Sequence, residues 1–396
     1  MTTTHDDKLF AELGALFAKA NRQLFLVGGS VRDTTLSREV KDWDFTTNAT
    51  PEEIEEIVID WCDALWDVGR DFGTIALRKR DVDIEITTFR TDGPGRKPEV
   101  TFSDSLLDDL ARRDFTVNAM ACPVTAEGID FGVGSLIDPF GGLEALLQRR
   151  LDTPRSPEDS FGDDPLRMMR AARFAAQLGF EITERVSTAI CGMHDRIESI
   201  SAERVQAELV KLLSGAFPEH GIAVMHGTGL TQHVLPGMTE RAPDRMLLGS
   251  DWQTRLADLL GDMAPARVSD LLQRLKMSNV DTATVTNLVA WEQRFDGTMW
   301  TDPTVRRVIA ASGPHMARLL ELLNDPKLNQ RVAVILDAEG HPEPPLTGQE
   351  IIDILGIKPG PRVGDAQRFL WQSRLDGGPQ DKETAERTLK AWAALS

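Results

Sequence analysis

The sequence of 396 residues changes its hydrophobic pattern once, near residue 160, and this change most constrains the fold. Before it, apolar and β-branched residues occur in short runs of strand length. The runs span residues 24–27, 44–47, 73–78, 82–89 and 116–123. From Pro165 onward, apolar residues recur with the period of a helix almost without exception. The pattern predicts an α+β protein, with a small mixed sheet that ends near residue 150 and an all-helical remainder.

Two helices are expected in the first part. Residues 1–24 carry an apolar stripe of helical spacing that includes Leu9, Leu13 and Phe17. Residues 51–61 form a short helix with Thr50 as its N-cap. The later helices are expected at 166–178, 183–193, 202–213, 221–225 and beyond 250, with joints at 154–162, 236–249 and 342–345.

Composition and charge narrow the class of protein. Three cysteines in no CxxC pair provide neither a disulfide framework nor a zinc knuckle. No export signal and no membrane-spanning run is found, so we expect a cytoplasmic protein with no membrane partner. The net charge of -18 argues against a protein that coats nucleic acid non-specifically, although a local basic groove stays possible.

The first candidate site follows the strand at 24–27. Gly28 and Gly29 let backbone N–H groups approach a phosphate, and Arg32 can clamp one. Asp42 and Asp44 lie two apart on the next strand, so both carboxylates emerge on one face and suit Mg²⁺ with phosphate oxygens. A plain turn and a solvated strand face are the alternatives for each motif alone. No GxGxxG follows a strand, and no GxxxxGK[ST] occurs.

Two further segments supply charged candidates. Glu85, in the alternating run DIEITT, is a third carboxylate for the aspartate pair, or else faces water on an edge strand. Arg113 and Asp114 enter the apolar run at 116–123. Arg113 suits a triphosphate and Asp114 a ribose hydroxyl, and a local salt bridge is the alternative.

The helix at 166–178 begins with a charged stripe. At 100° per residue, Asp164, Arg167, Arg170 and Arg173 cover roughly half of the helix circumference. An adjacent Asp and Arg can present a base-pair-like edge to a nucleobase, while further arginines bind phosphates. Asp164 before Pro165 also fits an ordinary N-cap, and the arginines fit a solvated face.

Six motifs stand in an order that is typical of one family. They are GGSVRD, DWDFTTNATPEE, IEITTFR, RRDFTVNAMA, IDPFGGLEAL and DDPLRMMRAARFAAQLGF. In this order the chain resembles class II template-independent nucleotidyltransferases, the family of bacterial CCA-adding tRNA nucleotidyltransferases and bacterial poly(A) polymerases. The resemblance is dense over residues 23–215 and returns at 346–364.

The resemblance implies a polymerase-β-like head at 1–150, a base-recognising neck at 151–220, a body at 221–345 and a tRNA-binding tail at 346–396. It also implies residue roles that agree with those above. Catalysis is expected from Asp42, Asp44 and Glu85, with Asp42 and Asp44 holding Mg²⁺. Nucleotide binding is expected from Gly28, Gly29, Arg32, Arg113, Asp114, Asp164, Arg167, Arg170 and Arg173.

The implied reaction is addition of C, C and A to the tRNA 3′ end from CTP and ATP. Addition of A alone or of poly(A) is the alternative within the family, and residues 68–75 favour the CCA-adding form. An inactive RNA-binding protein is the alternative of another class, against which the complete Asp42, Asp44, Asp164 and Arg167 set argues. Two departures from the family are Gly261, where relatives carry the His of an HD hydrolase signature, and a short loop at 91–98.

Overall fold

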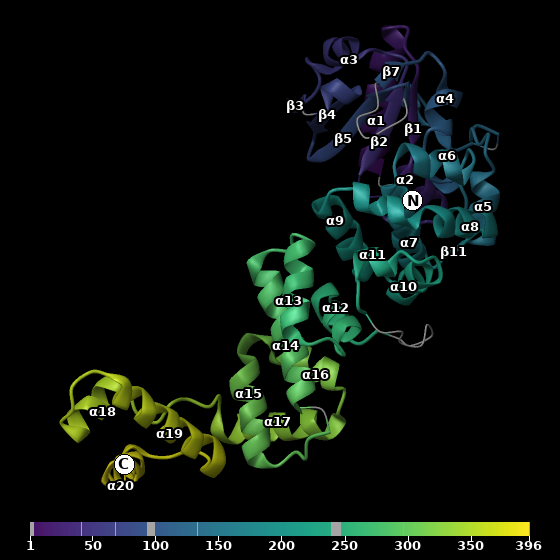
Figure 1. The fold of residues 1–396 in the computed structure, drawn as a ribbon. Coiled ribbons are helices and arrows are strands. Elements are labelled where there is room, and N and C mark those ends of the chain that lie inside the picture. The colour runs from purple at the N-terminus through teal and green to yellow at the C-terminus, as the bar shows by residue number, and fades with distance from the viewer. Residues whose placement is uncertain are drawn as a thin grey trace. The chain divides into compact units, whose positions relative to one another are not determined.

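The computed structural model describes residues 4–40, 42–67, 69–92, 100–132, 134–238, 247–295 and 297–395. The chain divides into two compact units, Met1–Pro236 and Gly237–Ser396 (Figure 1). The division falls at the joint predicted for 236–249. The finer division into head, neck, body and tail stays a prediction.

A mixed sheet of seven strands, counted over the described residues, is the centre of unit 1. β2 and β5 run parallel, and the other neighbouring pairs run antiparallel. In spatial order the strands are β3 (Ala64–Trp66), β4 (Thr74–Lys79), β5 (Val82–Thr88), β2 (Trp43–Thr47), β1 (Leu24–Val27), β8 (Ala121–Thr125) and β9 (Gly128–Ile129). β6 (Arg90–Asp92) pairs with β7 (Val100–Phe102) separately.

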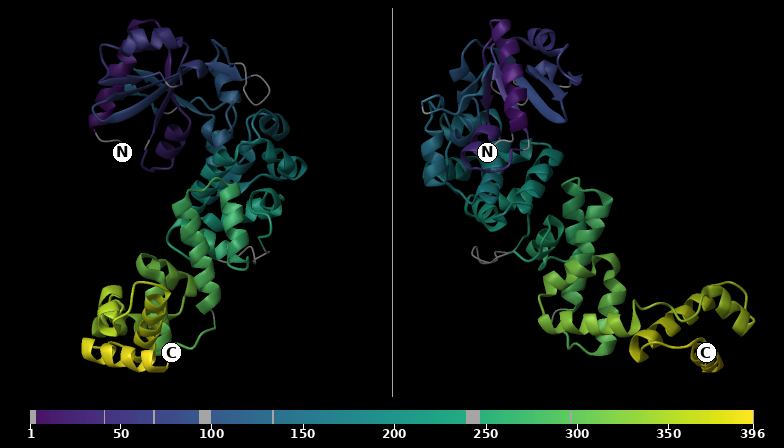
Figure 2. Two further views of the ribbon diagram at one scale, coloured as in Figure 1. Left: turned by 60° about the vertical axis from the view of Figure 1, so that its left-hand side comes forward. Right: turned by 180° about the vertical axis from the view of Figure 1, so that it is seen from behind.

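The two faces of the sheet differ because side chains alternate along each strand. On β2, Trp43 and Phe45 are buried and pack on Phe10 of α1 (Thr4–Lys19), with ring centroids 4.4 and 5.5 Å apart. Figure 2 shows α1 lying along the sheet. Asp44, between these two aromatic residues, therefore points to the opposite face, where the candidate site lies.

Helices complete unit 1. The predicted N-cap of α3 is confirmed, because the Thr50 side chain and Glu53 form a capping box. The helices are α2 (Gly29–Thr35), α3 (Pro51–Val58), η1 (Arg70–Phe72), α4 (Leu106–Ala111), η2 (Thr116–Asn118), α5 (Gly142–Gln148), α6 (Pro157–Asp163), α7 (Leu166–Leu178), α8 (Glu184–Met193), η3 (His194–Ser199), α9 (Ala202–Leu213), α10 (Pro218–Gly227) and α11 (Thr231–Val234).

Three expectations from the sequence were wrong. Residues 116–118 form the 3₁₀ turn η2 and the strand β8 begins only at residue 121, because the N–H groups of Asn118 and Ala119 donate to the carbonyl oxygens of Phe115 and Thr116 and close a turn. The expected joint at 154–162 contains helix α6, which Ser156 caps through the N–H of Asp159. A parallel strand pair, β10 (Arg150–Leu151) with β11 (Glu181–Ile182), interrupts the helical part.

Unit 2 is helical throughout its described residues. One of its cores includes Val305, Ile309 and Val332, and another includes Ile351, Leu370 and Leu389. Its helices are α12 (Trp252–Leu260), α13 (Pro265–Arg274), α14 (Asn279–Phe295), α15 (Asp302–Ser312), η4 (Gly313–His315), α16 (Met316–Leu323), α17 (Pro326–Glu339), α18 (Gly348–Leu355), α19 (Pro361–Gly377) and α20 (Lys382–Leu395). The predicted α+β class, a mixed-sheet head followed by helices, is confirmed.

Among the helices that the structure describes, none is both long and apolar enough to cross a bilayer.

Candidate active site

The aspartate pair is fixed by a buried serine. The Ser30 hydroxyl, from the start of α2, donates to the carbonyl oxygen of Asp42 at 2.8 Å and accepts the N–H of Asp44 at 3.2 Å. Ser30 therefore ties the turn after β1 to the beginning of β2. Asp42 lies immediately before β2 and not within it, and both carboxylates line the same cavity.

Glu85 stands beside this pair. In the parallel register of β2 and β5, Glu85 is the partner of Asp44, so the two side chains share one face. The alternative of an edge strand was wrong in its position, because β5 lies between β4 and β2, although Glu85 is exposed as that alternative expected. Two residues earlier on the same face, Asp83 is bound by Arg78 and contributes no charge to the site.

The pKa shifts of Asp44 and Glu85 show that the carboxylates of this site repel one another. Burial raises the pKa of Asp44, and the charge of Asp42 raises it further, while Arg113 and Arg32 oppose both effects. Partial burial and then Asp44 and Asp42 raise the pKa of Glu85. Among the described residues no three His, Cys, Asp or Glu side chains converge to hold a metal by themselves. The donor set is thus two carboxylates that need oxygen ligands from elsewhere, as Mg²⁺ with a phosphate substrate has.

Gly28 lies between the guanidinium of Arg113 and the carboxylate of Asp44, where there is little room for a side chain. Its φ of 72° is in the left-handed region, and a Cβ there would lie 3.0 Å from Arg113 Nη1 and 3.5 Å from Asp44 Oδ2. Arg113 is in turn held by Asp109, which is fully buried and also binds Arg112. The sequence argument missed Asp109, although its spacing of three and four residues from the two arginines is the usual signal for helical ion pairs.

Replacement of Gly28 by Ala is expected to reduce catalytic activity on the order of 10²-fold, because the methyl group displaces the Arg113 guanidinium and the left-handed backbone of residue 28 is strained in any residue but Gly. The matched control is Gly141→Ala. Gly141 has nearly the same φ, 73°, but nothing lies within 4 Å of its Cβ position. The measurement is kcat/KM for both variants; equal losses would assign the effect to backbone strain alone.

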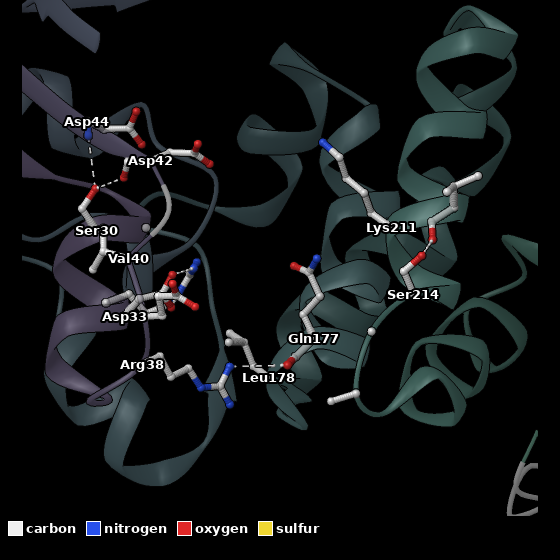
Figure 3. Close-up of a pocket in the computed structure, with 16 residues that line it drawn as sticks. Ser30, Asp33, Arg38, Val40, Asp42, Asp44, Gln177, Leu178, Lys211 and Ser214 are labelled. Atoms are coloured by element: carbon white, nitrogen blue, oxygen red, sulfur yellow. Dashed lines mark hydrogen bonds and ion pairs between the residues drawn. The ribbon is translucent and has the colours of Figure 1, made fainter. Parts of the chain in front are cut away.

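A cavity of about 490 Å³ opens beside the aspartate pair, within the size range of small-molecule sites. Gly29, Arg32, Asp42 and Asp44 line one wall. Figure 3 shows Lys211, Ser214 and Gln177, from α9, the residues that follow it and α7, facing them across the cavity. Lys211 places a cation opposite the carboxylates, and the sequence argument had not selected it.

Three predicted arginines gather around one aromatic ring. The guanidinium carbons of Arg32, Arg170 and Arg173 lie 5.3, 5.4 and 4.0 Å from the centre of the Phe174 ring, which is itself buried. Arg32 donates to Asn118 at 2.7 Å and to both carboxylate oxygens of Asp33. The ring thus joins the cavity wall to α7.

Buried acids compensate the charge of these arginines. Glu208, on the apolar face of α9 and 5% exposed, lies 2.5 Å from Arg173 Nε and 3.8 Å from Arg170 Nη1. An acid at an apolar position of a predicted helix was the signal that would have found Glu208. The alternative of a solvated face was wrong for Arg173, which is only 8% exposed.

Asp114 binds Arg170 and not its neighbour Arg113. Its Oδ2 accepts from Arg170 Nε at 2.8 Å and from Arg170 Nη2, and its Oδ1 accepts from Asn118 Nδ2 at 2.9 Å. Burial alone would raise the pKa of Asp114, but Arg170 and Asn118 outweigh it and hold that pKa well below the usual range. The carboxylate is therefore an anionic anchor between η2 and α7.

Asp164 and Arg167 hold the beginning of α7. Asp164 Oδ1 accepts the N–H of Leu166 at 3.2 Å, and its Oδ2 accepts from Arg204 at 2.9 Å. Arg167 donates to Ser160 Oγ at 2.9 Å and to the carbonyl oxygen of Arg112 at 2.6 Å. Neither residue is among those that line the cavity of Asp42 and Asp44. The predicted site residues therefore do not all line one pocket. Arg167 contacts the segment of Arg112 and Arg113, and the arginines of α7 contact Arg32 through the Phe174 ring.

Family models match the chain in two places. A model described as the poly(A) polymerase head domain matches residues 24–152, and one described as a probable RNA and SrmB-binding site of polymerase A matches residues 179–241. Fold and site together therefore define a nucleotidyltransferase of the poly(A) polymerase class.

Relatives resolve the class further. The CCA-adding enzyme of Enterococcus faecalis is 31% identical over 94% of both chains, and that of Bacillus velezensis is 40% identical over 56% of this chain and 54% of its own length. The solved CCA-adding enzyme of Bacillus stearothermophilus in complex with CTP matches with a TM-score of 0.77 and 26% identity, covering 100% of this chain and 99% of that one. The chain belongs to the family of CCA-adding enzymes, and it is a tRNA nucleotidyltransferase.

Proposed function

We propose that this chain adds C, C and A to the 3′ end of tRNA from CTP and ATP, by attack of the tRNA 3′-hydroxyl on the α-phosphate and departure of pyrophosphate. The observation that carries the proposal is the Asp42 and Asp44 pair on the wall of a cavity that also has arginine and lysine side chains. The long relatives in the family, matched over most of their length, support the same reaction. The unpaired Cys62, Cys122 and Cys191 support a cytoplasmic location.

Asp42 and Asp44 fit Mg²⁺, because both are carboxylates that only accept hydrogen bonds and both line an open cavity. Gly28, which has no side chain, lies next to Asp44. Bound there, two Mg²⁺ ions would stabilise charge on the attacking and leaving oxygens. The positive charge of Arg113 opposes the rise in the pKa of Asp44, and Arg113 would bind the triphosphate. Arg32, oriented by Asp33 and Asn118, presents its guanidinium to the cavity.

The experiment that tests the proposal uses two tRNA substrates, one ending before CCA and one ending after CC. Each is incubated with labelled CTP and labelled ATP separately, and product length is read at single-nucleotide resolution. We expect two C residues on the first substrate and one A on the second. Long A tracts would identify a poly(A) polymerase, and addition of A without C would identify an A-adding enzyme.

Asp164 and Arg167 are expected to select the base. Asp164 would accept from the amino group of C or A, and Arg167 would donate to the adjacent ring nitrogen. U and G, with donor and acceptor reversed, would leave buried groups unpaired. Asp164→Ala and Arg167→Ala should therefore reduce discrimination against UTP and GTP by about 10²-fold or more.

The measurement is kcat/KM for all four nucleotides, with unfolding followed in parallel. Loss of the Leu166 N–H bond to Asp164 should cost only about 1 kcal/mol of the free energy of unfolding. Asp163→Ala is the matched control, because Asp163 is the adjacent acid and pairs with Arg155 instead. If all four nucleotides lose the same factor in both variants, these residues do not read the base.

A further inference from the structure

The wall of the cavity that faces the aspartate pair carries a lysine. Lys211 lies near the end of α9 and lines the same cavity as Asp42 and Asp44. Figure 3 shows its side chain extending from α9 toward the wall of Asp42, with no ion pair drawn to it. Lys211 is exposed, so its ammonium group is accessible to a ligand in the cavity.

Lys211 differs from the other two cations that line this cavity. The guanidinium of Arg32 is bound by the carboxylate of Asp33, and Arg38 donates to the carbonyl oxygen of Gln177 at 3.4 Å. Within the described part of the cavity wall, Lys211 is the one cation that has neither an ion pair nor a hydrogen bond. An ammonium group of this kind can bind an anion from outside the protein, and lysine binds phosphate as a point charge.

The face of α9 on which Lys211 lies is open along its length. Four exposed residues recur along it at spacings of three and four: Arg204, Ala207, Lys211 and Ser214. The buried residues of α9 lie on its opposite face. At the beginning of the open face, Arg204 donates to Asp164, which is proposed to read the base. The open face therefore leads from the base-reading residue to the cavity of the aspartate pair.

We propose that Lys211 binds a phosphate group of a substrate in this cavity. The inference rests on the proposed function, because it takes the phosphate either from the tRNA 3′ end or from the triphosphate of CTP or ATP. In that function Arg32 and Arg113 already bind the triphosphate, whereas Lys211 lies on the wall that faces Arg32. This placement favours a phosphate of the tRNA 3′ end, whose terminal hydroxyl has to reach Asp42 and Asp44.

The experiment compares two variants of the full chain. Lys211→Met removes the charge and keeps the apolar stem, and Lys211→Arg keeps the charge. Equilibrium binding of tRNA that ends after CC, of CTP and of ATP is measured, together with KM and kcat. Lys211→Met should weaken tRNA binding and raise KM for tRNA by about 10-fold with kcat nearly unchanged, and Lys211→Arg should restore both.

The matched control is Lys19→Met. Lys19 is also an exposed lysine, but it belongs to α1, the helix that packs on the other face of the sheet through Phe10. Its replacement removes the same charge from the same unit and should leave the binding of all three substrates unchanged. The Tm of each variant is measured in parallel and should equal that of the parent, because both lysines are exposed.

The salt dependence of binding separates a phosphate contact from a structural effect. Each phosphate of a single strand that a protein cation neutralises contributes about 0.7 to the slope of log K against log salt concentration. The slope for tRNA should therefore be smaller by about 0.7 in Lys211→Met and unchanged in Lys19→Met. Weaker and less salt-dependent binding of CTP and ATP, with tRNA binding unchanged, would assign the phosphate to the triphosphate instead.

The proposal is wrong if Lys211→Met binds tRNA, CTP and ATP as the parent does. Weaker binding with the salt slopes of the parent would overturn it as well. A parent chain that binds tRNA without extending it would contradict the proposed function, while the salt slopes would still decide the role of Lys211. A parent chain that binds neither tRNA nor nucleotide would overturn both.

Discussion

Asp42→Ala and Asp44→Asn are each expected to reduce incorporation of both C and A on the order of 10³-fold or more, while tRNA binding stays largely intact. Both nucleotides share the triphosphate, and the two carboxylates are the proposed Mg²⁺ ligands for it. Loss of only one nucleotide's incorporation would contradict this role. The measurement is single-turnover extension with CTP and with ATP, together with tRNA binding by each variant.

The same Asp44→Asn variant should be more stable than the parent at pH 7. In the folded chain the pKa of Asp44 is raised, so its ionised form is disfavoured by the fold. A carboxylate of this kind destabilises the native state once the pH rises above its unfolded value, and a neutral amide removes that cost. The Asp44→Asn variant should therefore have a higher Tm and a lower activity than the parent. Asp83→Asn, an exposed carboxylate of β5 bound to Arg78, is the control and should change neither property appreciably.

Asp114→Asn is expected to lower the free energy of unfolding by about 1.5–3 kcal/mol, because it removes the charge of a buried carboxylate and leaves the half-buried Arg170 without its principal anion. Urea unfolding of the variant and the parent measures this difference. Since the native pKa of Asp114 is depressed, its stabilisation is present above the unfolded pKa of an Asp and is lost only as the pH falls through the lower native value.

A double-mutant cycle separates the pair from the rest of the arginine cluster. Asp114→Asn, Arg170→Met and the double variant are compared, and the double variant should be less destabilised than the sum of the two single changes. An additive result would mean that Asn118 and Glu208, rather than the ion pair, account for the effect. The exposed Asp83 again provides a control, expected to cost under about 1 kcal/mol.

Much of the fold could be predicted because the hydrophobic pattern and the capping residues within each segment determine its secondary structure. The strands at 24–27 and 82–88, the capped helix after Thr50 and the helix at 166–178 follow from alternation, capping and period. Residues 116–118 were misassigned because apolar β-branched residues also fit a tight buried turn, and only contacts distant in the sequence decide between the two.

The candidate site was predicted in its residue types but not in its connections. The pair Asp42 and Asp44 was predicted because residues two apart in an extended chain point the same way; Asp42 precedes β2, and both carboxylates still line one cavity. No spacing rule pairs Asp114 with Arg170, which lie 56 residues apart, or places Lys211 opposite Asp42. Such pairings depend on how helices pack on the sheet, which sequence period alone leaves open.

The short parallel ladder of Arg150–Leu151 with Glu181–Ile182 has a consequence for chimaeras. A junction at residue 150, where the strand-rich part of the sequence ends, would cut this ladder and separate Arg32 from Phe174 and Asp114 from Arg170. Exchange of catalytic modules between relatives at that point would therefore produce two halves with mismatched partners. A junction in the segment after Pro236 keeps these pairs within one parent, so the sheet that carries Asp42 and Asp44 and the arginines of α7 are inherited together.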